Sequence, residues 1–272
     1  MKLWTLGSGS SGNALLVEVP GGRVLVDAGV GPRVLSQRLA AIAVAPESIH
    51  ACVITHEHAD HVTGAAAAAK KWGWTLHASE GTIAACTELH EAGARPFRAG
   101  GRFTLAGMEV ETTPIPHDAA DPVALTITSH ATGARMGICY DAGHVTDGMR
   151  SLCRDVELLV LEANHDDAML QRGPYPFVVR QRIAGDQGHL SNRAASGLLR
   201  ETVSRTLRQV VLAHLSENCN TPGLAVACVA GALRSSRSKA KVVAAPRRMV
   251  AGPFEVGAER KAADPTQYAL AI

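Results

Sequence analysis

Apolar positions recur along the chain in two patterns: short runs of strand length and longer stretches with helical spacing. Strands are predicted at residues 2–6, 14–19, 23–26, 51–55, 75–78, 102–105, 108–114, 123–129, 135–140, 157–161, 209–213, 241–244 and 248–256. Helices are predicted at 32–43, 63–71, 79–91, 146–153, 174–184, 192–204 and 222–233. Because strands and helices alternate in both halves of the chain, we expect an α/β fold: two sheets flanked by helices, in a single domain over residues 1–272.

Several of the predicted strands end at a titratable residue. These residues are Asp27, His56, His117, Asp141, Glu162 and His214. Loops at one edge of a sheet, each carrying such a residue, are how a buried scaffold assembles a functional site. A turn-forming role explains Asp27 equally well, because aspartate favours turns at strand ends.

The richest of these loops is His56-Glu57-His58-Ala59-Asp60-His61, between a predicted buried strand and an Ala-rich helix. The His-x-His spacing places two imidazoles on the same side of an extended segment, and the Asp60-His61 pair then turns toward a second point. Four metal-capable side chains within six residues favour a metal site over a polar surface loop.

The remaining strand-end residues complete two sets of metal ligands. We assign His56, His58 and His117 to one ion, Asp60, His61 and His214 to a second, and Asp141 to a bridge between them. A water held by two such ions has its pKa lowered toward neutrality and becomes a hydroxide nucleophile.

Composition excludes several classes of protein. Hydrophobic residues make up 46% of the 272 residues and charged residues 19%, which predicts a sizeable core and not a disordered or coiled-coil chain. The net charge of +2 is compatible with an anionic substrate but does not by itself indicate nucleic-acid binding.

The spacing of the cysteines and the character of the N-terminal residues indicate the cellular compartment. The six cysteines form no C-x-x-C pair, as expected for buried thiols in a reducing environment. Gly and Ser soon interrupt the apolar N-terminal residues, so we expect no signal peptide, and no apolar run is long enough to span a membrane. These features predict a cytoplasmic protein.

The order Asp27, His56-x-His58-x-Asp60-His61, His117, Asp141, His214 resembles the metallo-β-lactamase superfamily. The segments Leu6–Ala14, Thr55–His61, His117–Pro122, Glu162–Asp166 and Gly188–Asn192 are similar to its YycJ branch. The resemblance implies a four-layer αββα sandwich, a dinuclear site with the ligands given above, and phosphodiester chemistry. Relatives in that branch are described as exonucleases acting on DNA. The 72 residues between Asp141 and His214 leave no room for the large cap domain of some related nucleases.

The resemblance also implies roles for residues outside the ligand set. His189 matches a histidine that contacts substrate phosphate and donates the leaving-group proton, and Glu162 matches the carboxylate that orients it. With Asp60, these are the catalytic candidates. Asp27 is expected to hold the histidine loop from behind the ligands.

The candidate substrate contacts are Asn13, His165, Ser191 and Arg182. Simpler explanations stay open for several of these residues: a helix-capping loop for His189, a surface strand end for Glu162, a turn for Asn13 and a solvated helix face for Arg182.

Taken together, the sequence predicts a dinuclear metal-dependent phosphodiesterase, foremost a DNA exonuclease-like nuclease that uses metal-bound hydroxide. The imidazole-rich ligand set favours zinc, while the carboxylates admit manganese or iron. The expected partner is a phosphodiester substrate such as nucleic acid, and a homodimer is left open. The alternatives are hydrolysis of small cyclic or nucleotide phosphodiesters, and a non-catalytic metal-binding regulatory protein.

Overall fold

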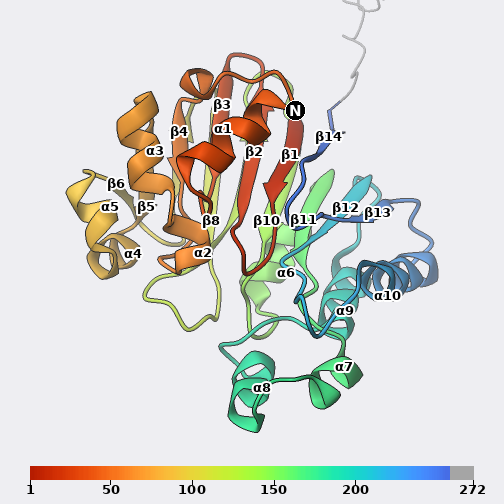
Figure 1. Ribbon diagram of the computed structural model, residues 1–272. Helices are drawn as coiled ribbons and strands as arrows, with labels where there is room; N and C mark the ends of the chain where they lie inside the picture. The colour runs from red at the N-terminus through yellow and green to blue at the C-terminus, as the bar shows by residue number, and fades with distance from the viewer. Residues whose placement is uncertain (258–272) are drawn as a thin grey trace, which may run out of the picture.

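The computed structural model describes residues 1–257, in which two mixed sheets pack face to face (Figure 1). The expected domain boundary at residue 272 lies outside these residues. Sheet A has the order β14-β1-β2-β3-β4-β5-β6 and sheet B the order β13-β12-β11-β10-β9-β8-β7. The strands of sheet A are β1 (Lys2–Gly7), β2 (Ala14–Val19), β3 (Gly22–Val26), β4 (Ala51–Val53), β5 (Thr75–Ser79), β6 (Arg95–Phe97) and β14 (Ala251–Glu255). Those of sheet B are β7 (Arg102–Leu105), β8 (Met108–Pro114), β9 (Val123–Ser129), β10 (Arg135–Cys139), β11 (Leu158–Glu162), β12 (Gln209–Ala213) and β13 (Lys241–Ala244).

Helices cover the outer face of each sheet and complete the predicted αββα sandwich. Sheet A carries α1 (Pro32–Ala40), α2 (Ala59–Val62), α3 (Ala65–Trp72), α4 (Glu80–Ala85) and α5 (Thr87–Glu91), with a 3₁₀ turn at Pro46–Ser48. Sheet B carries α6 (Asp147–Cys153), α9 (Asn192–Thr202) and α10 (Pro222–Ser235). Between β11 and α9, the short helices α7 (Asp167–Arg172) and α8 (Phe177–Ala184) stand away from the sandwich (Figure 1).

Alternation along the strands explains how one chain fills three apolar layers. In β11, Leu158 and Val160 point into the core between the sheets, while Leu159 and Leu161 pack under the helices of sheet B. In β2, Leu15 lies in the core between the sheets, whereas Leu16 packs under the helices of sheet A. Strands covered on both faces are expected to be mostly apolar, as these are apart from Glu18 in β2 and Glu162 at the end of β11.

Parallel pairing places the predicted site residues at a common edge. Strands β3, β4, β5 and β6 are parallel to one another, as are β10, β11, β12 and β13. Their carboxyl ends therefore meet at one rim of each sheet, where loops from different strands can share a site.

The structure departs from the predicted elements in several places, and strand β6 and the 3₁₀ turn at Pro46–Ser48 were not predicted. The helix expected over 63–71 begins only at Ala65, and the unpredicted short helix α2 precedes it. Gly64 separates the two helices, and an added Cβ there would lie 2.0 Å from the carbonyl oxygen of Val30. The helix expected over 79–91 breaks at Cys86, whose φ of −124° and ψ of 102° are extended. Helix α7 was not predicted, and the Asp166 carboxylate caps it by accepting hydrogen bonds from the backbone N–H groups of Ala168 and Met169.

Among residues 1–257, no helix is both long enough and apolar enough to cross a bilayer.

Candidate metal centre and catalytic site

The seven predicted metal ligands lie together at the rim between the two sheets. One group contains His56, His58 and His117, and a second contains Asp60, His61 and His214; within each, the ligand atoms lie within 4.8 Å of one another. Asp141 adjoins the second group, with Oδ2 3.0 Å from His61 Nε2 and Oδ1 2.9 Å from His214 Nδ1, and it also forms a group with His56 and His61. The structure thus brings all seven residues together, and their division between two ions stays a prediction.

Close backbone contacts fix the histidine loop against the neighbouring strand ends. The N–H groups of Asn13 and Ala28 donate to the carbonyl oxygens of Asp60 and His61, each at 2.8 Å. Gly29 is required here, because an added Cβ would lie 1.6 Å from the Asp60 carbonyl oxygen. The loop is thus rigidly held, as a site with defined ligand positions requires.

Two buried polar atoms in the cluster have no hydrogen-bond partner. They are His56 Nε2 and Asp141 Oδ2. The latter lies 3.0 Å from His61 Nε2, which carries no proton for it when His61 donates to Asp27 through Nδ1. His56, His61 and Asp141 form a further group in which the ligand atoms lie within 4.8 Å. A buried imidazole nitrogen and carboxylate oxygen left unpaired are costly unless a cation satisfies them. These residues therefore fit a divalent metal ion.

Burial and neighbouring charges shift the pKa values of the ionisable side chains in the cluster. Burial, reinforced by the charge of His61, holds the pKa of His56 well below its ordinary value, which keeps this imidazole neutral and able to coordinate a metal. Burial alone would raise the pKa of Asp60, but hydrogen bonds with His214 and His61 outweigh it and lower the pKa. Asp60 is therefore ionised, as a carboxylate ligand must be.

Asp27 lies behind the ligands and is completely buried. Its carboxylate accepts hydrogen bonds from the backbone N–H of Thr55 at 2.8 Å and from the hydroxyl of Tyr140 at 2.5 Å. Its Oδ2 lies 2.8 Å from His61 Nδ1, so that His61 donates through Nδ1 and presents Nε2 to the cluster. This is the geometry by which a carboxylate fixes the tautomer of a metal-binding histidine.

Glu162 holds His189 at the edge of the cluster. The Glu162 Oε1 atom accepts from His189 Nδ1 at 2.8 Å, and Oε2 accepts from the backbone N–H groups of Ala142 and Leu190. Burial alone would lower the pKa of His189, but the charges of Glu162 and Asp141 outweigh it and raise the pKa to about 9. Burial would likewise raise the pKa of Glu162, but His189 lowers it. Glu162 is thus a buried, ionised partner of His189 and not a surface residue.

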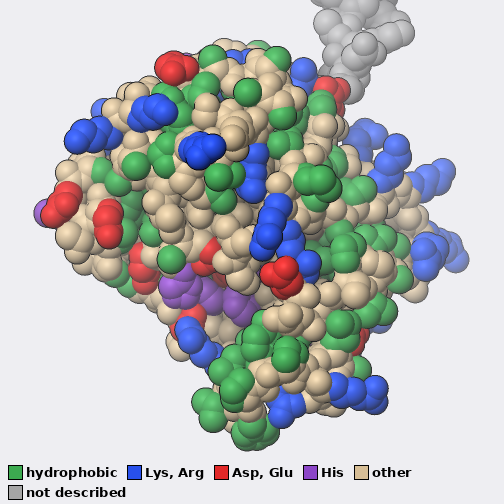
Figure 2. Space-filling model, viewed as in Figure 1, with side chains coloured by type: hydrophobic (Ala, Val, Ile, Leu, Met, Phe, Trp, Pro, Cys, Tyr) green, Lys and Arg blue, Asp and Glu red, His purple; other side chains and the backbone are tan. Residues whose placement is uncertain are grey.

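A cavity of about 230 Å³ opens over the cluster. Figure 2 shows the histidines gathered in a hollow between the body of the molecule and the α7–α8 segment. The lining comprises Ser10, His58, Asp60, His117, Asp118, Asp141, Val179, Arg182, Ile183, Gly188, His189 and His214. Arg182, from α8, donates through Nε to Asp118 Oδ2 at 2.7 Å. It is the one predicted substrate contact in this lining.

The other three predicted substrate contacts lie close to the cluster but outside the cavity lining. Asn13 Nδ2 donates to Asp60 Oδ2 at 3.1 Å, and its Oδ1 accepts from Gly9 N–H. Ser191 Oγ caps α9 by accepting from the N–H of Ala194, and His165 is buried with Nδ1 unpaired. Their contact with substrate stays a prediction.

Three residues that shape the site were not among those predicted from the sequence. Tyr140 bonds to Asp27, Asn164 donates through Nδ2 to the carbonyl oxygen of His214 at 3.0 Å, and Asp118 holds Arg182. In the sequence, each of the three is next to a predicted site residue. That proximity was the available signal, but it does not say which way a side chain points.

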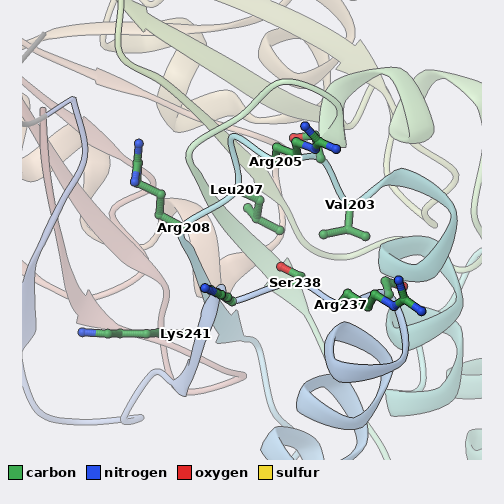
Figure 3. Close-up of a pocket in the computed structure, with 10 residues that line it drawn as sticks. Val203, Arg205, Leu207, Arg208, Arg237, Ser238 and Lys241 are labelled. Atoms are coloured by element: carbon green, nitrogen blue, oxygen red, sulfur yellow. The ribbon is translucent and has the colours of Figure 1, made fainter.

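A larger cavity, of about 450 Å³, lies at the opposite end of β12 (Figure 3). Its charged residues are all cations: Arg205, Arg208, Arg237, Lys239 and Lys241. No carboxylate, histidine or cysteine lines it, so it offers no metal ligands, and we place the chemistry at the histidine cluster instead.

Two helix-flanked sheets with a buried His/Asp cluster at their shared rim define a metallo-hydrolase. A family model described as "Beta-lactamase superfamily domain" matches residues 22–215. The chain belongs to the metallo-β-lactamase superfamily of metal-dependent hydrolases.

Two curated relatives match over most of their length. "Exodeoxyribonuclease WalJ" of Streptococcus pneumoniae is 33% identical over 230 residues, which cover 82% of this chain and 85% of the relative. "Exodeoxyribonuclease YycJ" of Bacillus anthracis is 31% identical over 226 residues, covering 81% and 84%. Among solved structures, Zn²⁺-bound PqqB from Methylobacterium extorquens has the same fold, with a TM-score of 0.68 at 16% identity over 93% of this chain and all of PqqB.

Proposed function

We propose that this protein is a dinuclear metal-dependent phosphodiesterase that degrades DNA as an exonuclease. The observation that carries the proposal is the assembly of seven metal-capable ligands with the Glu162–His189 pair beside them. The names of the two relatives, each aligned over more than 80% of both chains, support the choice of DNA as substrate.

We assign the ligands as the sequence predicts. His56, His58 and His117 would hold one ion, Asp60, His61 and His214 the other, and Asp141 would bridge the two. Imidazoles outnumber carboxylates in this set, which favours zinc over manganese or iron. Two bound ions lower the pKa of a shared water and neutralise charge on the phosphoryl oxygens.

The protein groups around the ligands supply orientation and a proton. Because Glu162 accepts only, His189 carries a proton on Nδ1; when also protonated on Nε2, its imidazolium can donate to the leaving oxygen. Asp27 holds His61 in one tautomer, and Asn13 positions Asp60. Arg182 would contact a phosphate of the substrate, with His165 and Ser191 as further contacts.

The first test is a nuclease panel on end-labelled single- and double-stranded DNA and RNA, with zinc and manganese supplied separately. We expect progressive shortening of DNA from one end. Cleavage of a small chromogenic phosphodiester with no loss of DNA or RNA would contradict the nuclease assignment and point to a small-molecule phosphodiesterase.

The Asp60→Ala substitution tests the dinuclear site. Removing this ligand should abolish hydrolysis, because one ion loses its only carboxylate apart from the bridge, while the circular dichroism spectrum stays that of the wild type. Metal analysis should show about two ions per chain in the wild type and fewer in the variant. Wild-type turnover in Asp60→Ala would rule out the two-ion assignment.

We further propose that the chain acts as a single catalytic domain. A homodimer is the oligomeric state that we propose to test. Light scattering at several protein concentrations gives the mass in solution. A monomer that is fully active in the nuclease panel would exclude a required dimer.

A further inference from the structure

Helix α8 exposes an unusual amount of apolar surface. None of its eight residues is buried. Phe177 is 63% exposed, Val178 76% and Val179 39%, and these make up three of the five large hydrophobic residues exposed within residues 1–257. Figure 2 shows this hydrophobic surface on the segment that stands below the histidine hollow. Contiguous exposed apolar side chains next to a site indicate a binding surface, because folding gains nothing from them.

The same helix forms one wall of the metal cavity. Val179, Arg182 and Ile183 line that cavity, while Phe177 faces a second hollow formed with α7. Consecutive helical residues are about 100° apart around the axis. Val179 therefore faces the metal cavity, Val178 lies about 100° further around the first turn of α8, and Phe177 lies about 200° around it, on the face toward α7.

Helix α8 is also tied directly to the catalytic loop. The N–H of His189 donates to the carbonyl oxygen of Ile183 at 2.9 Å. Gly188 allows this approach, since an added Cβ would lie 2.2 Å from the Ile183 carbonyl oxygen. These contacts tie the last turn of α8 to the loop that carries His189, and the helix places its apolar first turn relative to that loop.

The size of the metal cavity decides where the rest of a substrate strand must lie. At about 230 Å³, it is smaller than the roughly 300–1,000 Å³ typical of pockets that enclose a small molecule. It has room for the phosphodiester and part of a sugar, so the adjoining bases must rest on the rim.

The α8 side of this rim carries cations, whereas the cavity lining itself contains Asp60, Asp118 and Asp141, with Arg182 as its one arginine. The stretch from Arg172 to Gly185 contains three arginines and no acidic residue. Aromatic and aliphatic side chains bind bases through their faces, while arginine contacts the phosphates between them.

We propose that the first turn of α8 is the base-binding platform of the enzyme for an unpaired DNA end. The base next to the cleaved phosphodiester packs on Val179, and the strand then turns around the first turn of α8 over Val178 toward Phe177. Arg182, on the cavity face, exchanges its contact with Asp118 for the phosphate beside Val179. This inference rests on the proposed nuclease function and adds the preference for an unpaired end.

The test compares two double variants of the metal-loaded enzyme. Phe177→Ser with Val178→Ser removes the platform, and Leu224→Ser with Met249→Ser removes the same kind of side chain elsewhere, at 44% and 68% exposure. Steady-state kinetics are measured on a single-stranded oligonucleotide and on a small chromogenic phosphodiester. A stacked base contributes about 1–3 kcal/mol, so the ratio of kcat/KM for oligonucleotide over small diester should fall about tenfold or more, through KM, in the platform variant only.

A direct binding signal comes from Phe177→Trp, which keeps an aromatic face. The native tryptophans Trp4, Trp72 and Trp74 are all buried, so the introduced indole supplies the solvent-exposed fluorescence. Single-stranded DNA should quench it, and the kinetic ratio should stay near that of the wild type.

The outcomes separate the platform from the proposed function. A wild-type enzyme inert on every nucleic acid overturns both. An active wild type whose kinetic ratio is the same in the two double variants overturns the platform alone. A wild-type dimer that becomes monomeric in the platform variant, with its ratio unchanged, would show that α8 binds a second copy of the chain instead.

Discussion

Tyr140 illustrates how one buried hydroxyl can act on a metal site without touching it. It donates to Asp27, which fixes the tautomer of His61. Replacing Tyr140 by Phe would remove one hydrogen-bond donor from the fully buried Asp27 carboxylate. This loss should lower the free energy of unfolding by about 1–3 kcal/mol.

We therefore expect Tyr140→Phe to weaken metal binding by about tenfold. This is the lower end of the range of about 10- to 100-fold seen when a residue that hydrogen-bonds to a metal ligand is lost. Metal affinity is measured by competition with a fluorescent chelator. Tyr175→Phe serves as the control, because the Tyr175 hydroxyl accepts from Asn218 at the surface. Equal metal affinity in wild type and Tyr140→Phe would show that Asp27 does not need this donor.

The Glu162–His189 pair gives a second prediction at this scale. If His189 donates the leaving-group proton, His189→Ala should lower kcat by about 100-fold or more on a nucleic acid, whose leaving alkoxide needs that proton. The loss should be smaller on a nitrophenyl diester, whose leaving group departs without protonation.

Glu162→Gln should lower kcat in the wild-type background by about tenfold and add little to His189→Ala, because it acts through the histidine. Both variants are compared for kcat on the two substrates and for metal content. An equal effect of Glu162→Gln with and without His189 would remove Glu162 from this role.

The histidine cluster was predictable, because His56, His58, Asp60 and His61 are close in sequence and their spacing alone implies two metal positions. His117, Asp141 and His214 followed from the strand-end pattern and from the resemblance. The Tyr140–Asp27 contact spans 113 residues and depends on two strands of different sheets facing each other. Such a contact follows from the packing of the sheets and has no local signal.

At the scale of elements, the sequence predicted the start of three helices that a serine or threonine caps, but it missed α7, which Asp166 caps. Ser79, Thr146 and Ser191 each cap a helix through the side-chain oxygen. The break at Cys86 was not predicted, since the residues around it have no Pro or Gly to signal a stop. Packing against sheet A decides it instead, with Leu89 and Cys86 both buried in the core of that layer.

Ser191 offers a test that separates a cap from a substrate contact. Ser191→Ala removes the cap of α9. It should lower the free energy of unfolding by about 1 kcal/mol and Tm by about 2–4 °C. Thr146→Ala removes the equivalent cap of α6 and is the matched control. Thermal unfolding and oligonucleotide KM are measured for both. A KM increase confined to Ser191→Ala would support a substrate contact, and an unchanged Tm would contradict the cap.

At the scale of the molecule, the metal ligands come from both sheets. His56, His58, Asp60 and His61 follow β4 of sheet A, while His117, Asp141 and His214 follow β8, β10 and β12 of sheet B. Bound ions would therefore link the two halves of the sandwich, and their removal should destabilise the whole fold.

We expect chelation to lower Tm by roughly 10 °C, since ions present at about a thousand times their Kd contribute about 4 kcal/mol. Calorimetry before and after dialysis against a chelator measures this shift, and restored zinc should reverse it. The Tm of Asp60→Ala should fall less on chelation, because this variant already binds fewer ions. The same Tm with and without chelator would contradict a metal link between the sheets.

Three site residues at strand ends share a left-handed backbone: Asp27 at φ 59°, Asp141 at φ 58° and His214 at φ 54°. Aspartate, asparagine and histidine are the non-glycine residues that tolerate this conformation best, and aspartate and histidine are also metal ligands. Backbone and chemistry thus restrict these positions to the same few residue types. At Asp141 and His214, an exchange among them leaves the turn intact while changing the donor atom offered to the ion; at Asp27 it changes the partner of His61. A lineage built on this fold can therefore alter its metal preference by single substitutions, without first rebuilding the scaffold.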